Sequence, residues 1–424
     1  MRLWSAPLVL ALAAMPWAAT AEENGIRVGD GRLHPYFEFE TRYDSLLGYV
    51  GEDDGAKLTP YGDFGLHYRP GFTLEVPSER VQLDVAAHLD LIQYLGAEHE
   101  GTTEQNRLQA EADAAATFNP NGSVYFKVED TFRRGDRTSM LVLGVGSITD
   151  YNLARFRVGI QPGSKTLVIE PGYSLAYEHF EHSEGALKAS CADNDPSCDP
   201  DSVSAFDYLA HTVHLDATWK FLPKTALVFD SAFTSRSYIG EIEGEDGTME
   251  RPLEKFGTDN LRIMAGLAGM ITPKLSLTLK AGWGDQLQNE GFAGVIGQAE
   301  AVYRFSEQME ARAGYLRAFE SHPGRSLYYS DDRVYGNVRL GFGEKLEIIG
   351  QASYDAIGFG DEAKDRSDDL VTLALGPSYR ITPWLTGAVG FAHSARTTSL
   401  EEDQRSGLID YNRQEVYARV TATY

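Results

Sequence analysis

Long apolar runs are missing from this chain of 424 residues beyond its amino-terminal segment. A helix that crosses a membrane needs about 20 consecutive apolar residues, so the sequence argues against a helical membrane protein. Helical periodicity is missing as well, because apolar side chains recur at every second position. No Pro- or Ser-rich linker and no shift in composition divides the chain, which favours a single, evenly built body.

Basic residues are scarce, with 38 Lys and Arg against 62 Asp and Glu and a formal net charge of −24. Proteins bind nucleic-acid phosphates through Lys and Arg, so this balance opposes a nucleic-acid partner. Cysteine is scarcer still, since only Cys191 and Cys198 are present. In an oxidising compartment such a pair usually closes, which predicts a disulfide across one loop, with a redox site as the alternative.

Residues 1–21 have the pattern of a secretory signal peptide. One basic residue, Arg2, precedes the apolar stretch LVLALAAMPWAA, and Ala19-Thr20-Ala21 forms a cleavage site before Glu22. No cysteine follows this site, so a lipid anchor is not expected. The mature chain, 22–424, is predicted to form one domain.

Alternating strands account for the rest of the chain. In RVQLDVAAHLDL, for example, Val81, Leu83 and Val85 fall on one face, while Asp84 and Asp90 fall on the other. Eighteen such segments occur. They begin near residues 34, 58, 80, 105, 123, 152, 165, 205, 225, 258, 275, 294, 309, 327, 345, 368, 384 and 410.

The connections between these strands alternate between two kinds. One kind is short and rich in Pro and Gly, residues that favour tight turns, as in NPNGS (119–123) and TPK (272–274). The other kind is long and polar, as in YIGEIEGEDGTMERPLEKFG (238–257). This alternation predicts a sheet with one plain end and one elaborated end.

An even number of antiparallel strands with these connections predicts an all-β, up-and-down transmembrane barrel of about eighteen strands. In such barrels lipid covers the apolar face, short turns are periplasmic and long loops are extracellular. The last strand must pair with the first, because an open backbone edge is costly in hydrocarbon. Tyr424 matches the terminal aromatic signal that the barrel assembly machinery recognises, although Phe is the norm there. A large soluble all-β protein, a sandwich or propeller, is the alternative.

The polar face of the predicted strands carries charges of both signs and is expected to line the lumen. These residues are Glu38, Glu40, Arg42, Asp84, Asp90, Arg107, Glu111, Asp113, Lys127, Glu129, Arg155, Arg157, Arg333, Arg339, Glu415 and Arg419. Rings of charge set selectivity in water-filled pores, or the same residues pair across neighbouring strands and simply form the wall. Tyr36, Tyr125, Tyr335 and Tyr417 fall on the same face, where their rings suit sugar stacking.

No catalytic pattern is evident, so a role other than catalysis is expected. The G-x-S-x-G motif is missing. His179 and His182, like His211 and His214, are three positions apart, a spacing that puts each pair on opposite faces of a strand and disfavours a metal site. No cofactor is predicted. The acidic loop DNDPSCDPD (193–201) could hold calcium, but it lacks the EF-hand spacing, so a solvated tip is the simpler interpretation.

One connection, RGDRTSMLVLGVGSITDY (134–151), has an apolar middle, from 138 to 148 at its widest. It could fold into the lumen as a gate or plug, or it could extend above the membrane. If it crossed the membrane, the strand count would rise.

Two stretches share one layout, TDNLRIMAGLAGMITPKLSLTLKAGWG (258–284) and DLVTLALGPSYRITPWLTGAVGF (369–391). Each is an alternating strand, then Ile-Thr-Pro, then a strand with Gly near its middle. The early strand RLHPYFEFETRYDS ends in Tyr-Asp. These features resemble the beta-barrel porin 2 family of Gram-negative bacteria.

The resemblance implies a multi-pass barrel in the outer membrane, surrounded by its lipid. Some eighteen-stranded members, from myxobacteria and their relatives, are implicated in polysaccharide secretion with a short periplasmic export protein. The resemblance therefore implies an exopolysaccharide or capsule-type polysaccharide as cargo and such an export protein as partner. A passive porin for small polar solutes and a structural or adhesive barrel are the alternatives.

Overall fold

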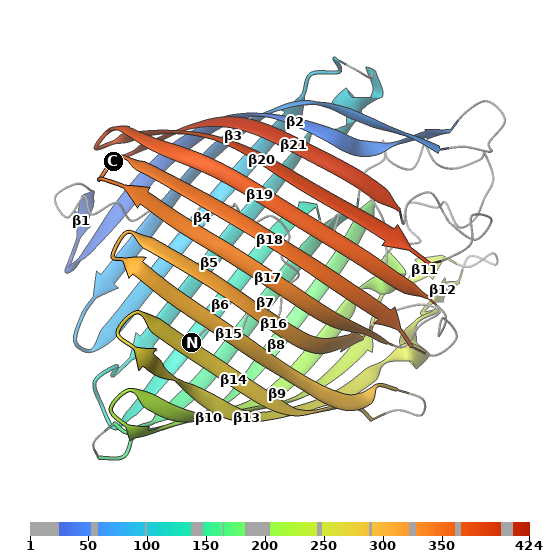
Figure 1. Ribbon diagram of the computed structural model, residues 1–424. Helices are drawn as coiled ribbons and strands as arrows, with labels where there is room; N and C mark the ends of the chain where they lie inside the picture. Colours follow the sequence, from blue (N-terminus) through green and yellow to red (C-terminus); the bar gives the residue numbers. More distant parts are fainter. Residues whose placement is uncertain are drawn as a thin grey trace.

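The computed structural model is a closed antiparallel barrel of eighteen strands (Figure 1). The structure describes residues 25–51, 58–97, 100–136, 147–163, 165–182, 204–243, 248–287, 291–321, 328–360, 366–399 and 410–424. The predicted signal peptide, Cys191, Cys198 and the acidic loop 193–201 lie outside these ranges, so those interpretations stay predictions.

The wall is formed by two runs of nine strands. The first run is β2 (Gly31–Gly51), β3 (Leu58–Pro77), β4 (Val81–Tyr94), β5 (Arg107–Phe118), β6 (Val124–Asp136), β7 (Ser147–Ile160), β8 (Leu167–His182), β9 (Tyr208–Leu222) and β10 (Thr225–Tyr238). The second run is β13 (Thr258–Thr272), β14 (Leu275–Gln286), β15 (Ala293–Ser306), β16 (Met309–Ser321), β17 (Tyr328–Phe342), β18 (Leu346–Phe359), β19 (Ser367–Thr382), β20 (Leu385–Thr398) and β21 (Tyr411–Thr423).

Short elements lie outside the wall. They are β1 (Ile26–Val28), which pairs with the start of β2, the hairpin of β11 (Ile242–Glu243) and β12 (Met249–Glu250), and the 3-10 turns η1 (Glu100–Gln105) and η4 (Glu254–Phe256). No helix in the described part of the chain is both long and apolar enough to cross a membrane.

All eighteen predicted strands are confirmed, each beginning within a few residues of its expected position. The largest difference is at β7, which begins at Ser147 and not near residue 152. The added residues are mostly polar, because the strand continues beyond the apolar part of the barrel wall and no longer has a hydrophobic face to reveal it.

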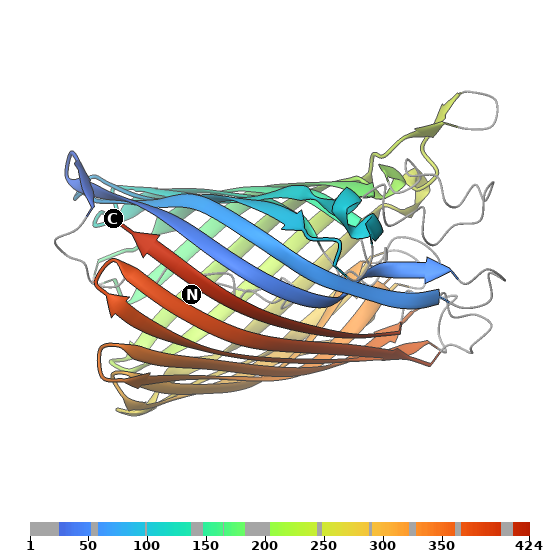
Figure 2. The ribbon, with the colours of Figure 1, turned by 90° about the horizontal axis from the view of Figure 1, so that it is seen from above.

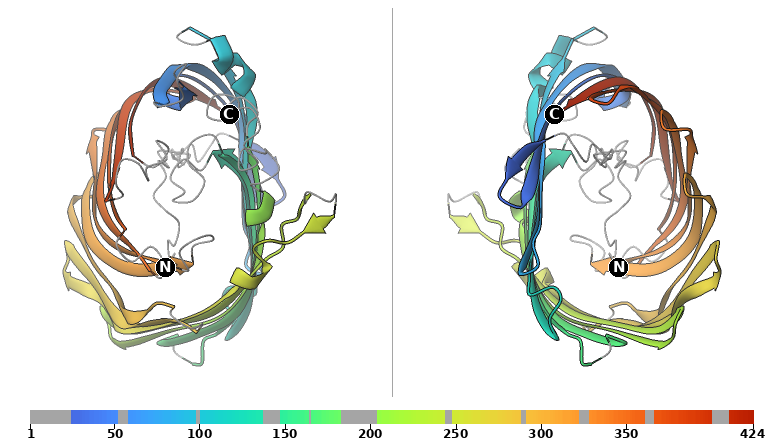
Figure 3. Two further views of the ribbon diagram at one scale, coloured as in Figure 1. Left: turned by 90° about the vertical axis from the view of Figure 1, so that its right-hand side faces the viewer. Right: turned by 90° about the vertical axis from the view of Figure 1, so that its left-hand side faces the viewer.

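Closure joins the first and the last strand of the wall. β2 and β21 pair in an antiparallel register that runs from Tyr36 opposite Thr423 to Asp44 opposite Glu415. The backbone N–H of Tyr424 continues the contact by donating to the carbonyl of Pro35 at 3.0 Å. Seen along the barrel axis, the strands therefore form a ring (Figure 3). The predicted pairing of last strand with first is confirmed.

The two ends of the barrel differ as the connections predict. At one end, called here the turn end, neighbouring strands are joined by tight turns, in which Asn119, Gly163 and Gly343 adopt positive φ. At the other, the loop end, longer connections separate the strands, and the β11–β12 hairpin projects from it (Figures 1 and 2).

Successive side chains point to opposite faces of the wall. In β2 the rings of Phe37 and Phe39 are 47% and 38% exposed, whereas Glu38 and Glu40 between them are 3% and 0% exposed. No second layer covers the apolar face in the described structure, so this face lies on the outside of the ring. A soluble sandwich would bury it, whereas a transmembrane barrel presents it to lipid; the sandwich and propeller alternatives are wrong.

The apolar stretch between β6 and β7 adds no strand to the wall. β6 pairs directly with β7, from Val124 opposite Ile160 to Asp136 opposite Ile148. The barrel therefore keeps eighteen strands, and the middle of the stretch, 137–146, lies outside the described residues. The gate or plug in the lumen and the extension above the membrane therefore both stay predictions.

Candidate functional site

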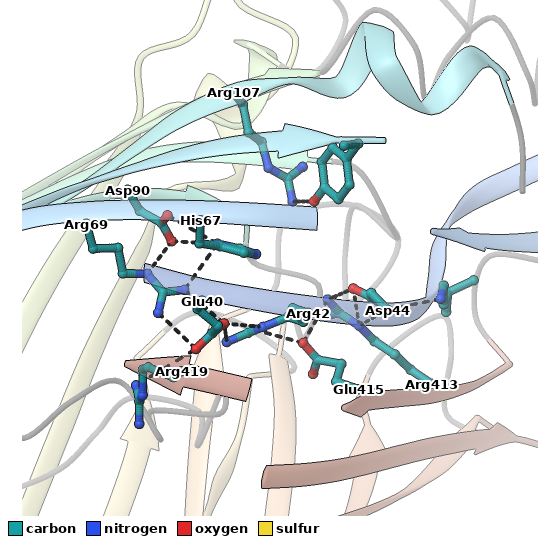
Figure 4. Close-up of polar contacts among 12 residues, drawn as sticks. Glu40, Arg42, Asp44, His67, Arg69, Asp90, Arg107, Arg413, Glu415 and Arg419 are labelled. Carbon is teal, nitrogen blue, oxygen red and sulfur yellow. Dashed lines mark hydrogen bonds and ion pairs between the residues drawn. The ribbon is translucent and has the colours of Figure 1, made fainter. Parts of the chain in front are cut away.

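A dense group of charges lies on the inner wall where β2 pairs with β21 (Figure 4). We call this group the seam cluster. Its members are Glu38, Glu40, Arg42 and Asp44 on β2, His67 and Arg69 on β3, Asp90 on β4, and Arg413, Glu415 and Arg419 on β21. Period-2 alternation places all of them on the face opposite the exposed apolar rings.

Arg69 is the centre of the seam cluster. Its guanidinium lies 2.7 Å from Glu38, 3.1 Å from Glu40 and 2.7 Å from Asp90. His67 lies 3.0 Å from Asp90 as well. One arginine thus neutralises carboxylates from two strands, and it shares the fully buried Glu40 with Arg42, which lies 2.7 Å from that carboxylate.

Charges also cross the seam in both directions. Arg42 of β2 lies 3.0 Å from Glu415 of β21, and Arg413 of β21 donates to Asp44 of β2 at 2.9 Å. Arg419 lies 3.4 Å from Glu38. Removing one partner of a buried ion pair is strongly destabilising, because the remaining charge is shielded from water and has no counter-charge. The seam cluster therefore holds the closed ring together where the last wall strand, β21, pairs with the first, β2.

A second charged group lies on β5, β6 and β7. Glu129 is bound by Lys127 at 2.7 Å, by Arg157, and by Arg155 at 3.8 Å. Next to it, Arg133 lies 3.1 Å from Glu111 and 3.8 Å from Asp113. The Lys127–Glu129 pair lies within β6, whereas the others join neighbouring strands, so the group stabilises the wall while leaving partly exposed charges toward the lumen.

The remaining predicted wall residues are more scattered. Arg333 pairs with Asp355 and lies 3.1 Å from Asp331, and Arg339 lies 3.3 Å from Glu347. Arg107 donates to the hydroxyl of Tyr94 at 3.2 Å. Asp84 is exposed. The sixteen residues thus fall into the seam cluster, the β5–β7 group and these separate positions.

An acidic row on β8, β9 and β10 was not singled out by sequence reasoning. Glu170 stands directly opposite Asp216, and Asp216 directly opposite Asp230. Lys280 reaches this row from β14 and lies 2.7 Å from Asp230. Strand parity could have placed each residue inside, since Leu227 and Phe233 mark the outer face of β10. That Glu170, Asp216 and Asp230 lie side by side across three strands follows only from the strand register.

Two tyrosines lie flat on the inner wall in identical arrangements. Tyr125 of β6 covers Gly159 of β7 and donates to Glu170 of β8 at 2.7 Å. Tyr335 of β17 covers Gly314 of β16 and donates to Glu300 of β15 at 2.8 Å. A Cβ at either glycine would overlap the ring. We call these the Tyr-Gly-Glu units; each spans three strands and leaves a partly exposed ring toward the lumen.

The other two predicted tyrosines share the glycine contact but differ in exposure. Tyr36 covers Gly71 and is partly exposed. Tyr417 covers Gly390 and is only 5% exposed, because the guanidinium carbons of Arg42 and Arg419 lie 5.6 and 5.3 Å from its ring centre. Tyr417 is therefore part of the seam and does not present a ring face to the lumen.

The histidines do not gather into a metal site. His211 contacts the Tyr173 hydroxyl at 2.6 Å on the outer face, whereas His214 lies over Gly172 on the inner face. At the loop end the Asp207 carboxylate accepts from His179 at 2.6 Å, and burial raises the pKa of Asp207 against this hydrogen bond. Within the described ranges no group of three or more His, Cys, Asp or Glu side chains could hold a metal ion.

No protein-family model and no curated protein matches this sequence. Among solved structures, OccK3 (OpdO) of Pseudomonas aeruginosa is 10% identical, with a TM-score of 0.44 over 92% of this chain and 95% of that chain. OccAB3 of Acinetobacter baumannii is 10% identical, with a TM-score of 0.45 over 94% and 100%. A mutant of the ferric enterobactin receptor PfeA of P. aeruginosa is 10% identical, with a TM-score of 0.46 over 92% and 80%. At TM-scores below 0.5, what this barrel does has to be argued from its own residues.

Proposed function

We propose that this chain forms a pore in the outer membrane of a Gram-negative bacterium, through which a secreted polysaccharide crosses with the help of a periplasmic export protein. The role is transport and not catalysis. In this proposal the turn end faces the periplasm and the loop end faces the outside, as in other outer-membrane barrels.

The observation that carries the proposal is the pair of Tyr-Gly-Glu units. A sugar ring presents C–H groups on its faces and hydroxyls at its rim, so it suits a flat aromatic ring beside a carboxylate. Tyr125 with Glu170 and Tyr335 with Glu300 offer this combination on nearly opposite parts of the ring of strands. The resemblance of the sequence to polysaccharide-secreting members of the beta-barrel porin 2 family also supports a polysaccharide as cargo.

The pairing of the wall charges also favours a polymer. A long chain must bind weakly at many positions, because conduction fails where binding is too tight. The seam cluster and the β5–β7 group consist mostly of acid–base pairs that satisfy each other. Such a wall offers polar contacts without a concentrated charge that would hold a polymer in place.

Deletion of the gene, followed by measurement of surface polysaccharide, tests the proposal directly. We expect the deletion to abolish the polymer, the wild-type gene to restore it, and Tyr125→Leu/Tyr335→Leu to restore it only in part. The matched control, Tyr125→Phe/Tyr335→Phe, keeps both rings and should restore export. Surface polysaccharide that persists in the deletion strain would refute the proposal.

A passive porin for small polar solutes is the second candidate. The partly exposed charges of the β5–β7 group favour it, because mixed charges orient small solutes in a wide pore. A porin should give large, steady currents in planar bilayers, whereas an export pore that waits for its partner should give small or gated currents. The deletion strain would then lose solute uptake and keep its polysaccharide.

A further inference from the structure

The wall is incomplete between β15 and β16 at the loop end. The two strands pair from the turn end only as far as Gly297 opposite Arg317. Beyond this point β15 continues back to Ala293 and β16 continues on to Ser321. Four residues of β15, 293–296, therefore have no strand partner on the β16 side in the described structure. The end of β16, residues 318–321, leaves the wall on this side.

The end of β16 lies across the inner face of the barrel. The Ser321 hydroxyl is 2.8 Å from that of Thr258 and accepts from Asn260 at 2.7 Å, both on β13. Arg236 of β10 donates to the Ser321 carbonyl at 3.3 Å. β13 is three strands from β16 around the wall and β10 is four, so the strand end must pass inside β14 and β15. In the end-on view the orange ribbon turns in from the wall (Figure 3).

Phe319 anchors this inward segment. Its ring stacks on Phe292 with centroids 4.5 Å apart, the guanidinium carbon of Arg262 lies 4.9 Å from its centre, and it is 1% exposed. On the other side it lies against Gly284 and Ile296, where a Cβ on Gly284 would overlap the ring. Tyr328, at the start of β17, completes the apolar cluster. A dry cluster of this kind is out of place on a polar pore wall and marks a docking contact between two parts of the chain.

We propose that residues 318–321 of β16, together with 328–330 of β17, form an inner latch that narrows the loop end of the pore when docked and opens it when released. The latch is a regulator of the transport pore proposed above, and it rests on that proposal only in requiring that the barrel conducts. Two arrangements are available to the same residues. Docked, residues 318–321 bind β13 through Ser321; released, the same four residues can extend the β15–β16 ladder along 293–296. In both arrangements they stay paired with the start of β17.

Release is favoured by what the docked state leaves unsatisfied. Three buried polar atoms beside the latch, Nε of Arg236, Nε of Arg262 and Oδ1 of Asn260, make no hydrogen bond within the described residues. Buried polar atoms without partners oppose the state that buries them. Docking also forgoes backbone pairing along 293–296. The docked latch is held by the aromatic cluster, by hydrogen bonds to β13 and β10 and by an ion pair of Arg262 with Glu320 at 2.9 Å. Hydration and strand pairing along 293–296 act against these contacts, which is the balance that a two-state element requires.

A disulfide lock tests the docked state. Thr258 and Ser321 bring their hydroxyl oxygens to 2.8 Å, so Thr258→Cys/Ser321→Cys places two sulfurs where they can bond. The pair is made in a Cys191→Ser/Cys198→Ser background to avoid exchange. We expect the oxidised barrel to show a single-channel conductance about two-fold or more below that of the same protein after reduction. Equal conductance before and after reduction, with the crosslink verified by mass, would overturn the proposal.

A releasing variant tests the other state. Phe319→Ala removes the anchor and should raise the mean conductance or the open fraction above wild type. The matched control, Phe305→Ala, removes an exposed ring from the outer face near the turn end and should leave both unchanged. Retarded migration without heating in a denaturing gel confirms that each barrel is folded. Wild-type currents from folded Phe319→Ala would refute the latch.

These measurements use salt currents and need no polysaccharide. If the deletion strain keeps its surface polymer while the lock and Phe319→Ala change conductance as expected, the export proposal fails and the latch stands. If deletion abolishes export while the disulfide lock and Phe319→Ala leave conductance unchanged, the latch proposal fails and the export proposal stands.

Discussion

Arg69 shows what a single buried charge does in this barrel. It binds Glu38, Glu40 and Asp90, all of which are nearly or fully buried. Its loss would take one counter-charge from each of these carboxylates at once and leave Glu38 with Arg419, Glu40 with Arg42 and Asp90 with His67. A buried charge that loses a partner is strongly destabilising. The same side chain ties β3 to β2 and β4.

Arg69→Ala should therefore lower the free energy of unfolding by about 3–5 kcal/mol. Urea unfolding in lipid vesicles, followed by tryptophan fluorescence, measures the change. Arg304→Ala is the control, since Arg304 pairs with Glu310 at 3.0 Å but is 67% exposed, and an exposed pair contributes about 1 kcal/mol or less. Equal losses for the two variants would show that burial is not the reason.

Gly159 is fixed by the ring of Tyr125 that covers it. Gly159→Ala should displace the ring, break its bond to Glu170 and cost about 1–3 kcal/mol through overpacking. The nearest atom to a Cβ on Gly336 is the Arg312 carbonyl oxygen at 3.4 Å, so Gly336→Ala should cost far less. A double-mutant cycle with Tyr125→Ala measures the coupling; additive effects would mean that the ring and the glycine do not depend on each other.

At this scale the sequence predicts faces but not partners. Alternation with Phe37 and Phe39 is enough to place Glu38 and Glu40 on the polar side of β2. Arg69 was not singled out, because its role depends on how β3 is staggered against β2 and β4. Register is a property of pairs of strands, and alternation within one strand contains no information about it.

Among elements, β14 shows how differently the two faces of one strand respond to charge. Leu279, near its middle, is 51% exposed on the outer face, and Thr278 beside it points inward. Leu279→Arg should cost about 2–4 kcal/mol, because a charge at the centre of the lipid face is desolvated. Thr278→Arg should lower the free energy of unfolding much less, and its charge in the lumen should change the conductance.

Unfolding in vesicles provides the measurement for both arginine variants. A smaller loss for Leu279→Arg than for Thr278→Arg would place the apolar face of β14 toward something other than lipid.

The strands themselves are predictable from the sequence because the wall is periodic, but the end of β16 is not. Alternation continues from Tyr315 through Arg317 to Phe319, which would put Phe319 on the outer face. Instead Phe319 is buried inside, because the strand leaves the wall after Arg317. A strand that leaves the wall and crosses its inner face keeps the same period-2 alternation, so the sequence does not reveal where it leaves. The cluster with Phe292 and Ile296 joins residues that only the three-dimensional structure brings together.

The barrel as a whole has a strong negative charge, and its inner wall is locally uneven. Glu170, Asp216 and Asp230 stand level across three strands, with Lys280 alone among nearby bases in a direct ion pair with the row in the described structure. Cations should therefore meet a more favourable wall than anions on that side of the lumen.

We predict a weak preference for K⁺ over Cl⁻, measured as the reversal potential across a KCl gradient in planar bilayers. Asp216→Asn/Asp230→Asn should reduce the permeability ratio by about two-fold. The control, Asp285→Asn, neutralises a carboxylate on the outward side of β14. Anion preference in the wild type, or an unchanged ratio in the double variant, would contradict this assignment.

The seam cluster has a consequence for how the barrel is made. Arg42 of β2 pairs with Glu40 of its own strand and with Glu415 of β21, and Arg413 of β21 pairs with Glu415 of its own strand and with Asp44 of β2. Until the final strand is in place, each arginine keeps only the carboxylate of its own strand, at the open edge of an unfinished sheet. The pairing of β21 with β2 therefore forms several ion pairs together as the barrel closes. Reopening the barrel would break all of them at once, so closure is hard to reverse.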